Sequence, residues 1–301
     1  AVPGFDTYGR NVSATPEAFR EQMDYAAEHF HPVSLEQVVA ALYGGSPLPR
    51  RPLLVTFDDG YRDNLTAAWP VLRERGIPMT VFLATDYIGE AHPFPWDLAA
   101  WCFHHTARDG AHLPVVGERR WATLGEREAV LGAWLERLKS LPEAGREEAM
   151  AGLPGCLGVT VPEGAFAGLC LSWDEVREMA RAGASFGAHT ERHPILTRVS
   201  AERARREVVG SKRRIEEELG TPVIAFAYPN GGPADVDSAA LRLLAEAGFL
   251  LGFPLLPGPE RSRAARRSPL ALRRIYVDSA DYGARFAAKL QGLPRLLPVA
   301  R

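Results

Sequence analysis

The stretch that most constrains the fold is residues 53–61, LLVTFDDGY, where an apolar run ends at two adjacent aspartates and a glycine. A continuous apolar run of this kind, followed by a turn signal, predicts a buried parallel strand. Asp58 and Asp59 would then lie at the carboxyl end of that strand, where α/β proteins place their chemistry. Two ionised carboxylates repel each other when they are buried together, unless a cation or a proton intervenes. Taken alone, the pair is more often a turn, with Asp59 capping the next helix and Asp58 in solvent.

A second polar stretch, residues 187–194 (GAHTERHP), ends another short predicted strand at 185–188. Its two histidines, His189 and His193, are four residues apart, which places both imidazoles on one side of a turn or a first helical turn. Two neutral imidazoles and one carboxylate are the ligands of a catalytic Zn²⁺ or a similar ion. An isolated pair of this kind is usually structural. Because both stretches would occupy the same edge of a sheet, together they predict a metal site.

Strands and helices alternate along most of the chain. Further strands are expected at residues 78–84, 223–228, 249–253 and 272–277, with helices at 64–75, 200–219, 237–247 and 281–290. This alternation predicts a closed or nearly closed (β/α) barrel, or a doubly wound sheet. The pattern changes over residues 86–168, where prolines, aromatic residues and two helical segments (126–141 and 143–152) occur without an obvious strand. We expect a largely helical insertion there, acting as a lid or a wall.

Composition excludes several classes of protein. The net charge of −2 over 301 residues provides no basic field for nucleic acid or anionic membranes. No stretch reaches the roughly 20 apolar residues that span a bilayer. Three cysteines without ligand-like spacing suggest buried thiols in a reducing compartment, although one disulfide is also compatible. The start at Ala1 suggests a trimmed chain, and no signal peptide is visible, so both the cytoplasm and the cell envelope remain open as locations.

The two polar stretches carry a resemblance to a known family. The sequence resembles the NodB-type polysaccharide deacetylases of carbohydrate esterase family 4, from about Phe19 to Val277. Residues 56–61 (TFDDGY) match the family's first motif, and the two histidines with their spacing match the second. The resemblance implies one deacetylase domain over residues 1–301, interrupted by the insertion. It also implies a distorted (β/α) barrel of about seven parallel strands.

The resemblance further implies roles for the polar residues. Asp59, His189 and His193 would hold a divalent metal, first of all Zn²⁺, with Co²⁺, Ni²⁺ or Mn²⁺ as alternatives, and Asp58 would be the general base. The reaction would be metal-dependent hydrolysis of N-acetyl groups on a glycan. Such a metal lowers the pKa of bound water toward about 7, and a carboxylate beside it can take the proton.

The third family motif, an arginine-x-proline-aromatic-glycine stretch, is altered here. Residues 226–231 read FAYPNG, so that Ala227 stands where the family has arginine and Asn230 where it has an aromatic residue. The backbone N–H of Asn230 can still serve as the oxyanion donor, which needs no side chain. The missing arginine normally orients the catalytic aspartate. On the strand expected at 272–277, Arg274 would point inward and replace it by pairing with Asp58.

The sequence also suggests substrate contacts and leaves the general acid open. We expect the substrate to contact Tyr61, Trp96 and Tyr228; for Trp96 a hydrophobic plug between insertion and barrel is an equal alternative. No histidine follows His193, whereas many family members use a late histidine as the acid. Asp58 returning its proton or a metal-bound water could act instead. Five other histidines are candidates by elimination only: His29, His31, His92, His104 and His105.

Two rival functions stay open. One is a catalytically silent carbohydrate-binding protein that kept the fold. The presence of Asp58 argues against it, because metal or sugar binding needs no second buried acid. The other is a deacylase or amidase of a small, non-polymeric substrate, which a closed pocket under the insertion would favour. If the protein is a deacetylase, as we prefer, its expected partner is an N-acetylated glycan.

Overall fold

The computed structural model describes residues 14–293 of the chain. The chain divides into two compact units. One is formed by the inserted segment Ala91–Leu169, and the other by the described residues before and after it. No helix within residues 14–293 combines the length and the apolar character needed to cross a membrane.

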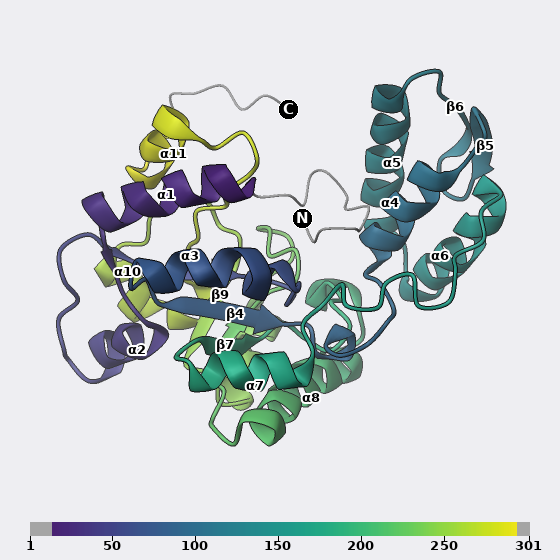
Figure 1. Cartoon of the computed structure of the whole chain (residues 1–301). Coiled ribbons are helices and arrows are strands. Elements are labelled where there is room, and N and C mark those ends of the chain that lie inside the picture. Colours follow the sequence, from purple (N-terminus) through teal and green to yellow (C-terminus); the bar gives the residue numbers. More distant parts are fainter. Residues whose placement is uncertain (1–13, 294–301) are drawn as a thin grey trace. The chain divides into compact units, whose positions relative to one another are not determined.

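The larger unit is built on one sheet of five parallel strands (Figure 1). In spatial order they are β3 (Val55–Phe57), β4 (Met79–Leu83), β7 (Ser185–Ala188), β8 (Ala225–Ala227) and β9 (Leu251–Phe253). A separate parallel pair consists of β1 (His31–Pro32) and β2 (Pro52–Leu53). The parallel (β/α) architecture is therefore confirmed, as a half-barrel sheet of five strands. The expected barrel of seven strands is not found among the described residues.

The prediction of a last strand at residues 272–277 is wrong. This segment follows a short 3₁₀ turn, η5 (Pro269–Ala271), and makes a single bridge, between Arg274 and Pro257. The Leu272 N–H bonds to the Gly252 carbonyl and the Arg274 N–H to the Leu256 carbonyl. An advance of two residues along this segment thus corresponds to four along its neighbour, so a regular strand register is not kept. The neighbouring segment contains Pro254 and Pro257, which cannot donate to a ladder.

Burial differs between the edge and the centre of the sheet. The predicted run at 53–57 is only partly buried, because β3 is the edge strand. All five residues of β4 are buried, as a continuous apolar run predicts for a central strand.

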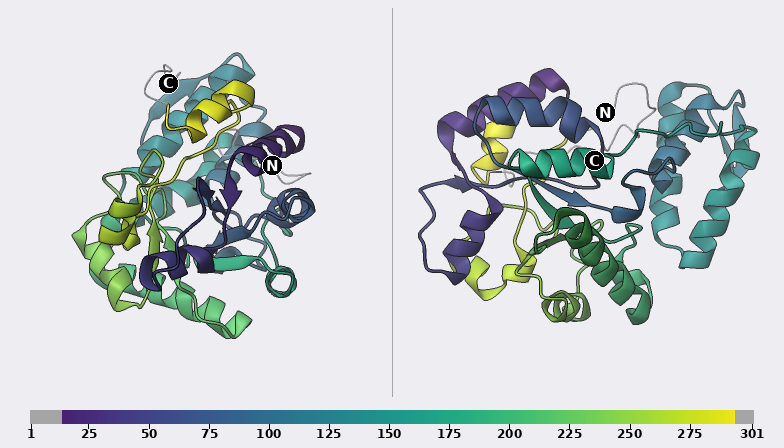
Figure 2. Two further views of the ribbon diagram at one scale, coloured as in Figure 1. Left: turned by 90° about the vertical axis from the view of Figure 1, so that its left-hand side faces the viewer. Right: turned by 60° about the horizontal axis from the view of Figure 1, so that its bottom comes forward.

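Helices cover both sides of the sheet, with α1 and α3 on one side and α7 and α8 on the other (Figure 1). Their bounds are α1 (Pro16–His29), α2 (Leu35–Tyr43), α3 (Trp69–Glu74), α7 (Trp173–Arg181), α8 (Ala201–Leu219), α9 (Ser238–Glu246), α10 (Ser262–Arg267) and α11 (Gly283–Leu290). Capping boxes start α2 at Ser34 and α7 at Ser172, as a serine followed three residues later by Gln37 or Glu175 predicts. In two further views α1 and α11 again lie side by side (Figure 2), so the two ends of the described chain meet.

The helix predicted at 64–75 begins as a wide π turn, η2 (Asn64–Ala68), before it continues as α3. The Trp69 N–H bonds back to the Asn64 carbonyl. Pro70 follows and has no N–H to close a normal turn, which favours the wider one.

The inserted unit contains three helices, α4 (Pro95–His105), α5 (Leu124–Lys139) and α6 (Glu143–Leu157). It also contains an antiparallel hairpin of β5 (Gly110–Leu113) and β6 (Gly117–Arg120), where we expected no strand. The sequence of β6, GERR, is polar and largely exposed, and therefore shows no alternation. The unit has its own core around the fully buried Trp134, whose indole N–H donates to the Pro114 carbonyl at 3.0 Å.

Gly187 lies in β7, two residues before the first histidine, at a position with no room for a side chain. A Cβ there would lie 2.5 Å from the Phe82 ring and 2.8 Å from the Ala225 carbonyl oxygen. We expect Gly187→Ala to lower the free energy of unfolding by about 1–3 kcal/mol, because the sheet must open. Urea denaturation would measure this. The control is Gly152→Ala, a helical site with open space around it; equal stability of the two variants would contradict the packing argument.

Candidate metal centre

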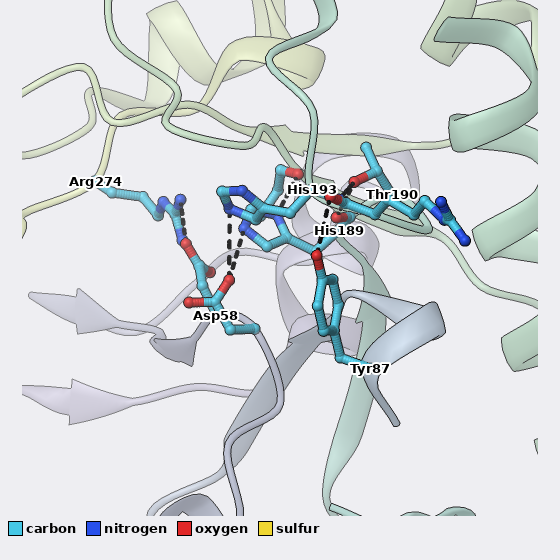
Figure 3. A network of polar contacts seen from close by, with 9 residues as sticks. Asp58, Tyr87, His189, Thr190, His193 and Arg274 are labelled. Carbon is cyan, nitrogen blue, oxygen red and sulfur yellow. Dashed lines mark hydrogen bonds and ion pairs between the residues drawn. The ribbon is translucent and has the colours of Figure 1, made fainter. Parts of the chain in front are cut away.

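The site is assembled from the carboxyl ends of strands that are distant in the sequence. Asp58 and Asp59 directly follow β3, and His189 directly follows β7, with β4 lying between these strands in the sheet. His193 follows after a short loop. Because all the strands are parallel, their carboxyl ends meet at one edge, and the predicted juxtaposition is present (Figure 3).

Three side chains converge on one point. Asp59 Oδ1 lies 3.5 Å from Nε2 of His189 and 3.5 Å from Nε2 of His193. One ligand atom from each of the three residues lies within 4.8 Å of the others. Such spacings allow all three atoms to reach a single ion at the usual 2.0–2.2 Å. The donor set of two nitrogens and one oxygen fits Zn²⁺ and leaves coordination positions for water or substrate.

The surroundings of His189 prepare it as a ligand. Its side chain is buried, and its Nδ1 lies 2.7 Å from the Ala227 carbonyl oxygen at the end of β8. Donation from Nδ1–H to this carbonyl leaves the lone pair of Nε2 directed at Asp59. Burial also lowers the pKa of His189 below its ordinary value, against the opposing charge of Asp58. The imidazole is thus held neutral, as a metal ligand must be.

Asp58 faces a different partner. Arg274 donates from Nη1 to Oδ1 at 2.7 Å and from Nη2 to Oδ2 at 2.9 Å, so the predicted ion pair is present and bidentate (Figure 3). Burial alone would raise the pKa of Asp58, but the charge and hydrogen bonds of Arg274, with His189 and His193, hold it below the usual value. A carboxylate that stays ionised beside a metal site can accept a proton at neutral pH.

Left-handed backbone concentrates in the loops of the site. Six non-glycine residues in the described part of the chain have positive φ, and four of them belong to these loops. They are Asp59 (72°), Thr190 (68°), His193 (58°) and Asn230 (61°). This region disfavours residues with a Cβ, so the surrounding contacts must hold the loops in place.

Thr190 was not expected as a site residue. It is buried, its hydroxyl accepts the His193 N–H at 2.9 Å, and it donates to the His189 carbonyl at 2.5 Å. A Ser/Thr turn of this kind could have been suspected from its place between the histidines. Glu207 of α8 also holds this loop, and nothing in the local sequence pattern indicated it.

The third loop follows β8 and carries Asn230. Its carboxamide donates to Asp235 Oδ2 at 2.5 Å, and the same oxygen accepts the Gly232 N–H at 3.0 Å. Arg198 lies 3.3 Å from the other oxygen of this buried aspartate. Asp235 therefore fixes the turn that presents the backbone of Asn230, a second residue that sequence reasoning missed.

The expected substrate contacts lie in different surroundings. Tyr228 is 1% exposed and its hydroxyl donates to the Leu270 carbonyl at 2.9 Å, so it packs in the core and offers no surface to a substrate. Tyr228 directly follows β8, and its phenol points into the packed interior. Tyr61 is partly exposed, and its backbone forms an isolated antiparallel β-bridge with Cys170. Trp96 stacks on Phe94 at 4.7 Å between ring centroids and packs against the core of the inserted unit.

The histidines considered as acids have local partners. His31 Nδ1 lies 2.6 Å from the Arg50 carbonyl, and His105 Nδ1 lies 2.9 Å from the Trp101 carbonyl. His104 pairs with Glu128 at 2.5 Å, and His29 lies 3.9 Å from Glu28. His92 is exposed. The three cysteines are free thiols, two of them buried.

Part of the sequence is similar to a curated protein. The poly-β-1,6-N-acetyl-D-glucosamine N-deacetylase of Escherichia coli (strain K12) is 40% identical over 65 residues, which is 21% of this chain and 10% of that protein. The chain thus spans about a tenth of the length of this curated relative.

Two solved structures share the fold. The Streptococcus pyogenes deacetylase PplD in complex with acetate aligns with a TM-score of 0.60 and 20% identity, covering 93% of this chain and 88% of that one. IcaB from Ammonifex degensii aligns with a TM-score of 0.57 and 20% identity, covering 92% and 89%. A model of the family described as polysaccharide deacetylase matches residues 45–251, more than half of the sequence. The chain therefore belongs to the polysaccharide deacetylase family.

Proposed function

We propose that this protein removes N-acetyl groups from an N-acetylated glycan by metal-dependent hydrolysis. The observation that carries the proposal is the pairing of Asp58 with Arg274 beside the Asp59, His189 and His193 cluster. A protein that only bound metal or sugar would have no use for a second carboxylate held charged next to the ligands.

The metal would be held by Asp59, His189 and His193, with Zn²⁺ favoured by the nitrogen-rich donor set and Co²⁺, Ni²⁺ or Mn²⁺ as alternatives. When bound, a divalent ion polarises the acetamide carbonyl and acidifies a water molecule. The Ala227 carbonyl keeps His189 in the tautomer that can bind the ion.

Asp58 is the general base in this proposal. Its carboxylate takes a proton from water as the water oxygen attacks the acetamide carbon, and Arg274 keeps it oriented. The backbone N–H of Asn230 donates to the carbonyl oxygen as negative charge develops there. The C–N bond then breaks, and the proton goes to the departing sugar amine, giving acetate and a free amine. Asp58 is one residue that can return that proton.

The substrate class follows from the family and from the relative that is named for poly-β-1,6-N-acetyl-D-glucosamine. We propose a polymer of N-acetylated hexosamine. Tyr61, which is partly exposed, remains a proposed aromatic contact.

Asp58→Asn tests the assignment of the base. We expect acetate release to fall by about 10²–10⁴-fold, because an amide cannot take the proton, while bound metal stays near the wild-type ratio. Elemental analysis and an acetate assay give the two readouts. Asp174→Asn, an exposed aspartate paired with Arg177, is the matched control and should behave as wild type. Unchanged turnover in Asp58→Asn would contradict the proposal that Asp58 is the general base.

Arg274 is expected to matter through Asp58. In Arg274→Ala we expect turnover to fall about 10²-fold, because the carboxylate loses its orientation. The acidic limb of the pH–rate profile should also move to higher pH, because the arginine that holds the pKa of Asp58 down is gone. Arg274→Lys should restore only part of the rate, since an ammonium cannot donate as a fork. An unaltered profile and rate in Arg274→Ala would contradict this role.

The length of the substrate separates the proposal from its rivals. We expect the rate of acetate release per acetyl group to rise from N-acetylglucosamine to its longer β-1,6-linked oligomers, because a polymer-acting site binds several sugar units. Activity confined to the monosaccharide or another small amide would favour the small-substrate deacylase. No release from any glycan, with metal bound, would favour the silent carbohydrate-binding protein.

A further inference from the structure

The loop between the two histidines is bonded to groups outside it on both sides, in addition to the bonds of the Thr190 hydroxyl. The turn η3 (Thr85–Tyr87), which follows β4, donates to its carbonyls. Thr85 N–H bonds to the Thr190 carbonyl at 3.1 Å, Asp86 N–H to the Glu191 carbonyl at 3.0 Å, and the Tyr87 hydroxyl to the Arg192 carbonyl at 3.5 Å. The loop therefore takes its shape from its neighbours more than from bonds of its own.

The N–H groups of the same loop are held from α8. Glu207 is 3% exposed, and its Oε2 accepts the N–H groups of Glu191 and Arg192 at 3.0 and 2.8 Å. Its other oxygen lies 3.4 Å from Arg203, one turn earlier on the helix. One buried carboxylate thus bonds two of the three residues between the histidines. Charge-assisted bonds of this type are among the stronger ones.

This contact acts against a strained backbone. Thr190 and His193 flank the two bonded residues, and both have positive φ. The left-handed conformation is unfavourable for a residue with a Cβ, so outside contacts are needed to keep the loop in this shape. Relaxation would rotate His193 relative to His189, whose own position is fixed separately by Ala227.

We infer that Glu207 is a positioning residue that sets the affinity of the site for its metal, by fixing the distance between the two imidazoles. The inference rests on the proposed function, because it takes Asp59, His189 and His193 as the ligands. Glu207 acts through the backbone N–H groups of Glu191 and Arg192.

The test measures metal binding without substrate. The Zn²⁺ dissociation constant is determined by competition with a chromophoric chelator for wild type, Glu207→Gln and Glu207→Ala. We expect Glu207→Ala to bind about 10–100-fold more weakly, as is typical when a partner of a metal ligand is lost, and Glu207→Gln to lie between it and wild type. The absorption spectrum of the Co²⁺-loaded variants should shift, because the coordination geometry changes.

A matched control comes from the same helix. Glu202→Gln removes an exposed carboxylate of α8 that pairs with Arg206, one turn later, and we expect wild-type Zn²⁺ affinity. If Glu207→Ala does not fold, Glu207→Gln carries the test. The inference would be overturned if the Glu207 variants bound Zn²⁺ within twofold of the wild-type affinity and only their metal-free melting temperature fell. Glu207 would then have a purely structural role.

The same measurements keep this inference apart from the proposed function. If the Glu207 variants bind Zn²⁺ more weakly and the wild-type protein releases no acetate from any glycan, the inference is supported and the proposed function is rejected. Unchanged affinity in an active deacetylase would reject the inference alone. A wild-type chain that binds no divalent ion would overturn both.

Discussion

The site depends on two neighbouring carboxylates facing different partners. Asp58 meets the guanidinium of Arg274, whereas Asp59 meets the imidazoles of His189 and His193. The left-handed conformation of Asp59, with φ of 72°, turns the chain between them. Two adjacent acids at a partly buried strand end would otherwise repel each other, and one would take up a proton. Their separation leaves Asp59 as the proposed metal ligand and Asp58 as the proposed base.

The sheet supplies the remaining constraints through its order. β7 carries His189 and lies between β4 and β8, so that the Ala227 carbonyl of β8 can bond to the imidazole while η3 after β4 holds the following loop. Each neighbour of β7 thus supports a different part of the second motif. The close approach of these strands is possible because Gly187 has no side chain. Packing beside His189 in this way supports the geometry of the proposed metal site.

Local signals in the sequence predicted local structure well. The capping boxes at Ser34 and Ser172 and the continuous apolar run of β4 describe interactions within a few residues, and these are present. Predictions that depended on long-range pairing did less well. The strand expected at 272–277 failed because its partner segment contains Pro254 and Pro257, and Tyr228 proved to be buried by contact with Leu270.

From the sequence alone one could predict that two polar motifs follow parallel strands and meet at one edge of the sheet as the donors of a proposed metal site, because apolar runs and the geometry of parallel sheets need no knowledge of packing. The sequence also determined the family, through the same motifs. Only the tertiary structure decided which groups hold those donors in place. The bonds of Glu207 to the histidine loop and of Asp235 to the Asn230 loop join residues whose partners no local pattern names. Such contacts are specified by how α8 and the loops pack in space, and packing depends on the whole chain at once.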